Sequence, residues 1–309
     1  MHSGVDLCTR VGSVQLANPV MTASGTAGQG AELDAYVPLR SLGAVVVKSL
    51  AVRPWPGNPA PRLAEVPGGL LNSVGLQGPG VAAWLEGDLP ALVAAGATVV
   101  ASIWGASPDD YAGAAAMLAA APAAVAAVEV NLSCPNVEAR HAVFAHSAAA
   151  TAEAVAAAVG ASGGRPCWAK LSPNVTDLVA IAGAALGAGA QGLTLVNTLM
   201  GLAIDPATRR PRLGAGGGGL SGPALHPVAV RAVHDVHGAF PGAPIVGVGG
   251  VATGAHAVEL LLAGASAVQV GTATFADPRA PGRVLAELVE WCRRHGVERV
   301  ADLTGAAWS

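Results

Sequence analysis

The stretch "VAAVEVNLSCPNV", residues 125–137, joins an apolar run to a cluster of polar residues. The run ends at Asn131, and Cys134 and Asn136 follow on either side of a proline. A nearly continuous apolar run of this length is typical of a strand in a parallel sheet, because such a strand is buried on both faces. The stretch therefore predicts a buried strand whose carboxyl end carries a thiol and two amides.

Seven more short runs of this kind occur along the chain. The eight predicted strands cover residues 19–24, 44–48, 98–104, 125–131, 166–171, 192–197, 244–248 and 267–271. Stretches with helical character lie between them, among them residues 108–121, 147–159, 176–186, 227–237 and 253–263. "SPDD" at residues 107–110 predicts a helix start, with serine as the cap and proline in the first turn. Strands and helices that alternate eight times predict a (β/α)8 TIM barrel, and an open doubly wound sheet is the alternative.

Two stretches exceed what a minimal barrel needs. Residues 50–80 are rich in proline and glycine, and residues 198–226 separate the sixth and seventh units. Both follow the carboxyl ends of predicted strands, so we expect these loop insertions to lie over the C-terminal mouth of the barrel. Because nothing in the sequence is typical of a domain linker, residues 1–309 are expected to form one domain.

The composition narrows the class of protein further. The chain has 309 residues, of which 52% are hydrophobic and 12% charged, and this balance favours a globular protein over a disordered one. A net charge of −3 supplies no electrostatic reason to bind nucleic acid or an anionic membrane. No stretch reads as a secretory signal or a membrane span. The four cysteines lie far apart, which predicts a cytoplasmic protein with reduced thiols and no metal site.

Polar residues gather at the predicted strand ends. They are Ser24, Lys48, Ser102, Asn131, Lys170 and Asn197. In a (β/α)8 barrel, these positions face the active site. Burying a lysine is costly unless it meets an anion or another acceptor. The two lysines therefore indicate a negatively charged or carbonyl-rich ligand.

Glycines follow the last two predicted strands, in "GVGG" at residues 247–250 and in "GT" at residues 271–272. Barrels often bind phosphate at these two loops, because glycine lets the backbone N–H groups approach the anion. The alternative is that these glycines only form tight turns. Together with the lysines, the pattern favours a large phosphorylated ligand such as FMN, whose reduced form a lysine could stabilise.

Cys134 differs from the other cysteines by its predicted position at the barrel mouth. A thiolate there could act as a nucleophile or as a general base. Cys8, Cys167 and Cys292 are predicted to be inert. The predicted loops also carry four amides, Asn72, Asn131, Asn136 and Asn197. Amide donors and acceptors suit a small planar ring with several C=O and N–H groups, such as a pyrimidine.

A series of motifs resembles the class 1 dihydroorotate dehydrogenases, and within them the class 1B catalytic subunit. The matching motifs are "NPVMTASGT" (18–26), "VVVKS" (45–49), "NSVGLQGPG" (72–80), "EVNLSCPNV" (129–137), "AKLSPNVTD" (169–177), "LVNTLMGLAIDPATRRPRL" (195–213), "GGLSGPAL" (218–225), "PIVGVGGV" (244–251) and "LLAGASAVQVGTATFADP" (261–278). They cover nearly the whole chain in order. The resemblance implies a barrel that binds FMN.

The resemblance also implies a role for each matching residue. Cys134 would remove the C5 proton of dihydroorotate while the C6 hydride passes to FMN. The substrate would be held by Lys48, Asn72, Ser73, Val74, Gly75, Leu76, Asn131, Asn197 and Thr198. FMN would be lined by Ser24, Lys48, Ser49, Ser102, Asn131, Lys170, Val196, Gly222, Gly249, Gly250, Gly271 and Thr272.

Enzymes of the 1B type work with an iron–sulfur flavoprotein subunit that carries FAD and a 2Fe–2S cluster and passes electrons to NAD⁺. The resemblance therefore implies a homodimer that binds two such partners, giving a heterotetramer. Two departures from the family pattern stand out. Ser102 replaces an asparagine near the cofactor, with Trp104 close by, and Gly78 replaces an asparagine in the substrate loop, which is expected to loosen that loop.

Other functions stay open at this point. A fumarate-dependent class 1A dehydrogenase and a dihydropyrimidine dehydrogenase-like flavoenzyme share the same kind of barrel. A flavin-free barrel lyase or isomerase that acts on a phosphorylated substrate would also need the glycine loops. A non-catalytic relative retained as a binding partner is the last alternative.

Overall fold

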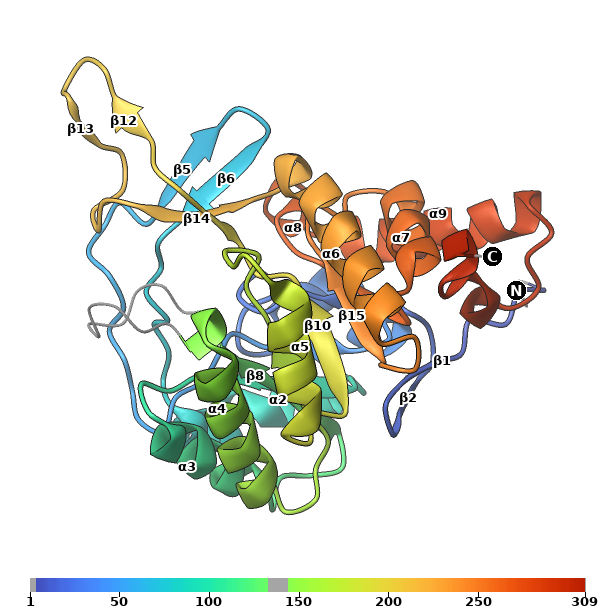
Figure 1. The fold of residues 1–309 in the computed structure, drawn as a ribbon, viewed down its shortest axis with the longest axis horizontal. Coiled ribbons are helices and arrows are strands. Elements are labelled where there is room, and N and C mark those ends of the chain that lie inside the picture. The colour runs from blue at the N-terminus through green and yellow to red at the C-terminus, as the bar shows by residue number, and fades with distance from the viewer. Residues whose placement is uncertain (1–3, 133–143, 309) are drawn as a thin grey trace.

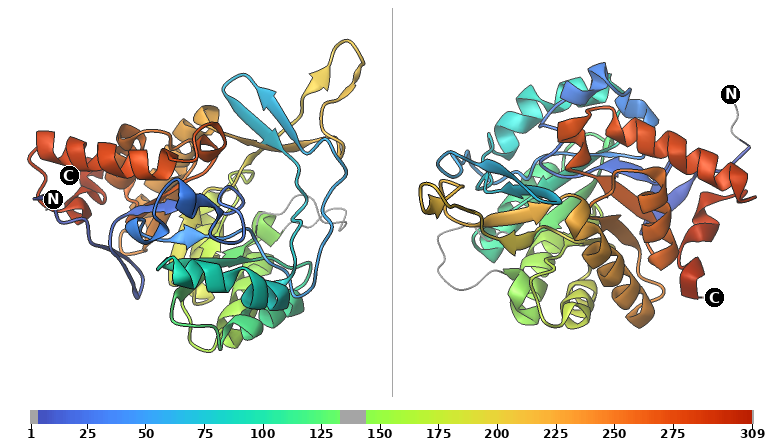
Figure 2. Two further views of the ribbon diagram at one scale, coloured as in Figure 1. Left: turned by 180° about the vertical axis from the view of Figure 1, so that it is seen from behind. Right: turned by 90° about the horizontal axis from the view of Figure 1, so that it is seen from above.

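Eight parallel strands form a barrel in the computed structural model, which describes residues 4–132 and 144–308. The strands are β3 (Val20–Thr22), β4 (Val45–Val46), β7 (Val99–Ile103), β8 (Val125–Asn131), β9 (Cys167–Lys170), β10 (Gly192–Leu195), β15 (Ile245–Val248) and β16 (Ala267–Val270). A parallel bridge between Met21 and Ala44 joins β3 to β4 and closes the sheet. All eight predicted strands are confirmed, and so is the (β/α)8 TIM barrel (Figures 1 and 2).

Helices surround the barrel on its outer face (Figure 2). They are α1 (Val81–Gly87), α2 (Leu89–Ala94), α3 (Pro108–Leu118), α4 (Ala148–Ala161), α5 (Leu178–Gly187), α6 (His226–Ala239), α7 (Gly254–Ala263), α8 (Ala273–Ala276) and α9 (Ala280–Arg294). Short 3₁₀ helices lie at Glu32–Ala35, Leu39–Ser41, Phe144–His146, Pro223–Leu225, Val300–Leu303 and Ala306–Trp308. The predicted start of α3 is confirmed, because Ser107 and Asp110 form a reciprocal capping box.

The inside of the barrel is apolar at its amino-terminal end. Met21, Val100 and Trp168 are fully buried there. The hairpin of β1 (Thr9–Val11) and β2 (Val14–Leu16) contributes its own apolar side chains to the same cluster. Thr9 Oγ1 donates a hydrogen bond to the carbonyl directly before β16, so the hairpin covers the amino ends of the strands. This filled end leaves a ligand site to the opposite, carboxyl end.

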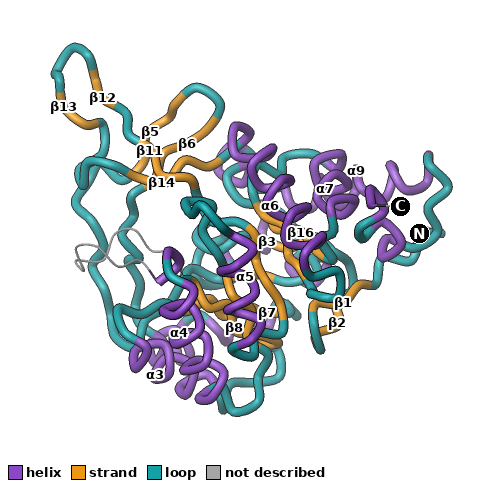
Figure 3. Tube along the Cα trace, viewed as in Figure 1, coloured by secondary structure: helices purple, strands orange, loops and turns teal. Residues whose placement is uncertain are grey.

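The two insertions meet in a second, antiparallel sheet. Its four strands are β11 (Leu199–Gly201), β14 (Gly218–Ser221), β6 (Gly69–Asn72) and β5 (Leu63–Val66), in that spatial order. A hairpin of β12 (Ile204–Asp205) and β13 (Arg210–Pro211) extends from it. The sheet stands over the carboxyl ends of the barrel strands, as predicted for the insertions (Figure 3). Its strand pairing joins segments about 150 positions apart and was not predicted.

The length and apolar character of the helices decide whether any of them could cross a membrane. Within residues 4–132 and 144–308, no helix has both the length and the apolar character needed to cross a bilayer.

Candidate active site

One cavity of about 720 Å³ lies between the carboxyl ends of the barrel strands and the antiparallel sheet. It is lined by the predicted residues Ser24, Lys48, Ser49, Asn72, Val74, Gly75, Leu76, Asn131, Lys170, Val196, Asn197, Thr198, Gly222, Gly249, Gly250, Gly271 and Thr272. A cavity of this size is typical of cofactor and substrate sites. The structure therefore brings most of the predicted site residues together around one space.

Two predicted residues lie behind the cavity wall rather than on it. Ser73 is fully buried, and its hydroxyl accepts a hydrogen bond from the Asn58 side-chain amide. Ser102 is also fully buried, and its hydroxyl lies 2.9 Å from the hydroxyl of Ser49, which does line the cavity. Both residues support the wall, so any influence on a ligand passes through their neighbours.

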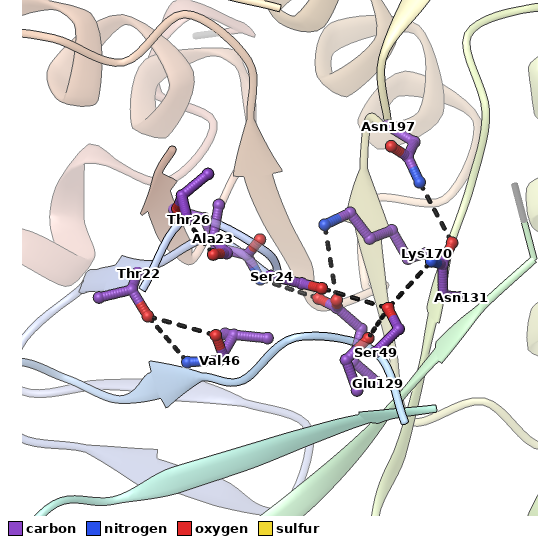
Figure 4. Close-up of polar contacts among 12 residues, drawn as sticks. Thr22, Ala23, Ser24, Thr26, Val46, Ser49, Glu129, Asn131, Lys170 and Asn197 are labelled. Carbon is purple, nitrogen blue, oxygen red and sulfur yellow. Dashed lines mark hydrogen bonds and ion pairs between the residues drawn. The ribbon is translucent and has the colours of Figure 1, made fainter. Parts of the chain in front are cut away.

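A chain of hydrogen bonds orients the amides on one side of the cavity (Figure 4). Asn131 Nδ2 donates to Ser49 Oγ at 3.1 Å. Asn131 Oδ1 accepts from Asn197 Nδ2 at 3.1 Å, and Asn197 Oδ1 accepts from the backbone N–H of Thr198 at 2.8 Å. Because each oxygen has a defined donor, both amides are held in one orientation. The site is thus prepared for a ligand with a fixed pattern of donors and acceptors.

The two predicted lysines both reach the cavity, from different strands. Lys48 follows β4 and is half-buried, with its aliphatic stem packed beside Gly25. Lys170 ends β9 and is only 5% exposed. Its Nζ lies 3.5 Å from Glu129 Oε1 (Figure 4). The cavity therefore carries two ammonium groups, one of which has a buried carboxylate beside it.

Glycine loops form the opposite end of the cavity. Gly222, Gly249 and Gly250 all have positive φ angles, which glycine adopts without strain. A Cβ atom at Gly250 would lie 2.8 Å from the carbonyl oxygen of Gly222, so the two loops pack backbone against backbone. Thr272 Oγ1 joins this end by donating to Ser221 Oγ at 2.7 Å. Backbone thus lines the cavity here, as an anion site requires.

His226 supports the glycine loops and was missed in the sequence analysis. Its Nδ1 lies 2.8 Å from the carbonyl oxygen of Gly249, and its Nε2 lies 3.0 Å from Glu259 Oε2. A carbonyl oxygen can only accept, so Nδ1 carries a proton. The histidine begins α6 and is buried, and it ties this helix to the loop after β15 and to α7. Its position directly after "GGLSGPAL" was the available signal.

Two residues that depart from the family pattern have clear structural partners. Trp104 is buried, and its ring meets that of Trp55 edge to face, with centroids 5.6 Å apart. Trp55 itself lines the cavity. Gly78 exchanges two backbone hydrogen bonds with Trp55, at 2.9 and 3.0 Å. These bonds hold the segment that was expected to loosen.

Cys134 and Asn136 lie outside the described residues, as does the whole of 133–143. The described chain on both sides is well anchored. The backbone N–H of Ala145 donates to the carbonyl of Leu132, and Tyr111 Oη donates to the carbonyl of Asn131 at 2.8 Å. The catalytic role of Cys134 therefore stays a prediction.

The three described cysteines lie away from the cavity lining. Cys167 is 2% exposed, and burial raises the pKa of its thiol to about 11. Burial also raises the pKa of Cys292. Cys8 is exposed, and a hydrogen bond with Asp6 raises the pKa of its thiol. A raised pKa keeps each thiol protonated near neutral pH, which makes it a poor nucleophile.

We expect Cys167 and Cys292 to resist iodoacetamide in the folded protein at pH 8. With a pKa of about 11, the Cys167 thiol is ionised to roughly one part in a thousand at that pH. Peptide mapping by mass spectrometry measures the labelling of each cysteine. The same protein in urea is the control, in which both thiols should react. Rapid labelling of Cys167 without denaturant would contradict the buried position.

The fold and the cavity together define a (β/α)8-barrel protein with an enzyme-type site at the carboxyl ends of its strands. The chain belongs to the dihydroorotate dehydrogenase family, whose model matches residues 6–291. This agrees with the resemblance drawn from the motifs.

Individual relatives resemble nearly the whole chain. A protein of Pelobacter propionicus is 46% identical over 301 residues, which cover 97% of this chain and 98% of the relative. A protein of Trichlorobacter lovleyi is 45% identical over 300 residues, with coverage of 97% and 98%. A protein of Desulforudis audaxviator is 47% identical over 303 residues and covers 98% of both chains. Each is named "Dihydroorotate dehydrogenase B (NAD(+)), catalytic subunit".

Proposed function

We propose that this protein oxidises (S)-dihydroorotate to orotate in pyrimidine biosynthesis, as the catalytic subunit of an NAD⁺-dependent dihydroorotate dehydrogenase. One observation carries the proposal: a single cavity unites glycine loops, two lysines and oriented amides in a chain 45–47% identical to relatives of that name. Residues 1–309 act in this proposal as one FMN-binding domain in the cytoplasm.

The described residues fit FMN at this cavity. The backbone of Gly222, Gly249 and Gly250 would receive the phosphate, because a side chain at Gly250 would fill the space that the loops share. Lys170 would face the flavin ring, where an ammonium group stabilises negative charge on the reduced form. When bound, FMN supplies the acceptor for the hydride from C6 of dihydroorotate.

The other cavity residues would bind the substrate and move its proton. Asn131 and Asn197 share a hydrogen bond and would present their remaining groups to the C=O and N–H groups of the ring. Asn72 lies on the antiparallel sheet and would close the ring from the other side. Lys48 would pair with the substrate carboxylate. Cys134 would take the C5 proton as general base.

The partner follows from the same proposal. Electrons would leave FMN through an iron–sulfur flavoprotein subunit that carries FAD and a 2Fe–2S cluster, and would reach NAD⁺. The catalytic chain would form a homodimer, and two partner subunits would complete a heterotetramer. The words "catalytic subunit" in the names of the relatives support a second subunit.

We expect dihydroorotate to bleach the bound flavin of the purified chain under anaerobic conditions, because the hydride transfer needs no partner. Absorbance at the flavin bands measures the reduction. Reoxidation by NAD⁺ should require the partner subunit, and fumarate alone should not support turnover.

Each other outcome favours a specific alternative. Turnover with fumarate and no partner would favour a class 1A enzyme. A flavin that is reduced by a dihydropyrimidine without a carboxylate, but not by dihydroorotate, would favour a dihydropyrimidine dehydrogenase-like enzyme. A colourless protein that binds no FMN would favour a barrel lyase or isomerase. A flavin that neither substrate reduces would indicate a non-catalytic relative.

A further inference from the structure

Three polar side chains meet inside the barrel, below the cavity floor. They come from three strands: Glu129 from β8, Lys170 from β9 and Gln269 from β16. Glu129 and Gln269 are fully buried, and Lys170 is 5% exposed. Lys170 Nζ lies 3.5 Å from Glu129 Oε1, and Gln269 Nε2 donates to Glu129 Oε2 at 2.9 Å. Glu129 Oε2 therefore accepts a hydrogen bond, whereas Oε1 makes an ion-pair contact with the lysine but no hydrogen bond.

The position of Glu129 is unusual for a carboxylate. It lies two residues before Asn131 on the same strand, so both side chains point into the barrel. Two residues earlier, Ala127 already belongs to the apolar cluster that fills the barrel. A buried carboxylate is costly to ionise unless a cation and hydrogen-bond donors compensate it. Lys170 supplies the cation, and its side chain also lines the cavity.

We infer that Glu129 is a positioning residue that places the Lys170 ammonium and offsets its charge, and thereby lowers the reduction potential of the bound flavin. The inference rests on the proposed function, in which Lys170 faces FMN. A lysine alone beside a flavin favours the reduced, anionic form and raises the potential. A carboxylate behind that lysine opposes the effect, and in the barrel interior the opposition is weakly screened.

The inferred role matches the proposed electron path. The nicotinamide couple has a low reduction potential, so a flavin that passes electrons toward NAD⁺ must not be stabilised too strongly in its reduced form. Lys48 reaches the same cavity from β4 and adds a second positive charge. Glu129 is the carboxylate that forms an ion pair with Lys170. It therefore offsets part of the positive charge beside the flavin.

We expect Glu129→Gln to raise the midpoint potential of the bound FMN. The expected shift is at least tenfold in the equilibrium toward reduced flavin, which is about 30 mV for a two-electron couple. The substitution keeps the shape of the side chain. Gln269 can turn its amide over and accept from the new amide, so the interior stays hydrogen bonded. A spectroelectrochemical titration of the purified holoprotein measures the potential.

Three comparisons separate charge from packing. Glu290→Gln removes the same charge from an exposed position on α9, where the carboxylate is 55% exposed, and should leave the potential unchanged. Glu129→Asp keeps the charge but retracts it from Lys170, so its potential should lie between those of the wild type and Glu129→Gln. If Glu129→Gln does not fold, the comparison of Glu129→Asp with the wild type tests the inference. A thermal unfolding scan of each variant measures its folding stability separately from the flavin potential.

Unchanged midpoints in folded, flavin-loaded Glu129→Asp and Glu129→Gln would overturn the inference, and a lowered thermal midpoint alone would show a purely structural role. The measurement does not depend on dihydroorotate, because a chemical reductant sets the potential. A wild-type protein that binds FMN but does not oxidise dihydroorotate would therefore contradict the proposed function and leave the role of Glu129 testable.

Discussion

Replacing Cys134 with serine is expected to slow the reduction of the bound flavin by dihydroorotate by about 10²- to 10⁴-fold near neutral pH, the usual contribution of a positioned general base. A serine hydroxyl has nearly the size of the thiol but ionises far less readily, so it accepts the C5 proton poorly. FMN should stay bound, because the predicted phosphate and ring contacts come from other residues. Anaerobic stopped-flow absorbance measures the rate.

The matched control is Cys8→Ser, which makes the same chemical change at an exposed thiol outside the cavity lining. It should reduce its flavin at the wild-type rate. The rate of the Cys134→Ser variant should also keep rising to a higher pH than the wild-type rate, because a serine hydroxyl ionises at a higher pH than a thiol. A wild-type rate in Cys134→Ser at pH 7 would remove this residue from the mechanism.

Replacing Gly250 with alanine is expected to weaken FMN binding on the order of 100-fold, since a strained backbone position costs about 1–3 kcal/mol. Gly250 has a φ of 65°, which alanine rarely adopts. The added Cβ would lie 2.8 Å from the carbonyl oxygen of Gly222 and 2.7 Å from His226 Cβ. The loop can relieve this crowding only by moving away from the position that receives the phosphate.

Flavin fluorescence during titration of the apoprotein measures the affinity. Gly242→Ala is the matched control, because a Cβ at that loop position would meet nothing within 4 Å and no positive φ has to be held. Its affinity should equal that of the wild type. Wild-type affinity in Gly250→Ala would show that the phosphate does not bind against this loop.

The barrel was predictable because each strand is a local pattern. Runs such as residues 98–104 and 125–131 are mostly apolar, and such runs are typical of a parallel sheet that is covered on both faces. Val99 and Ala101 pack outward against helices, while Val100 joins the cluster inside the barrel. Strands that alternate with helices run parallel, so their carboxyl ends lie at the same end of the barrel. Lys48, Asn131 and Lys170 could therefore be assigned to one site from the sequence.

The interior pairing was not predictable in the same way. Glu129 stood in the sequence as a lone charge in an apolar strand, and that oddity was a usable signal for a buried partner. The identity of the partners was not, because Gln269 lies 140 positions away along the chain. His226 was missed because its role depends on a tertiary contact with the loop of Gly249, which the sequence pattern does not show.

The sequence by itself determined the eight strands, the helices between them, the family and the set of residues at the strand ends. These features depend on periodicity and motif order, which are properties of neighbouring positions. Only the tertiary structure decided that residues 50–80 and 198–226 pair in one sheet over the cavity, and that Glu129 stands behind Lys170. Such contacts depend on barrel closure, because closure brings distant segments within hydrogen-bond range at a register that no local pattern encodes.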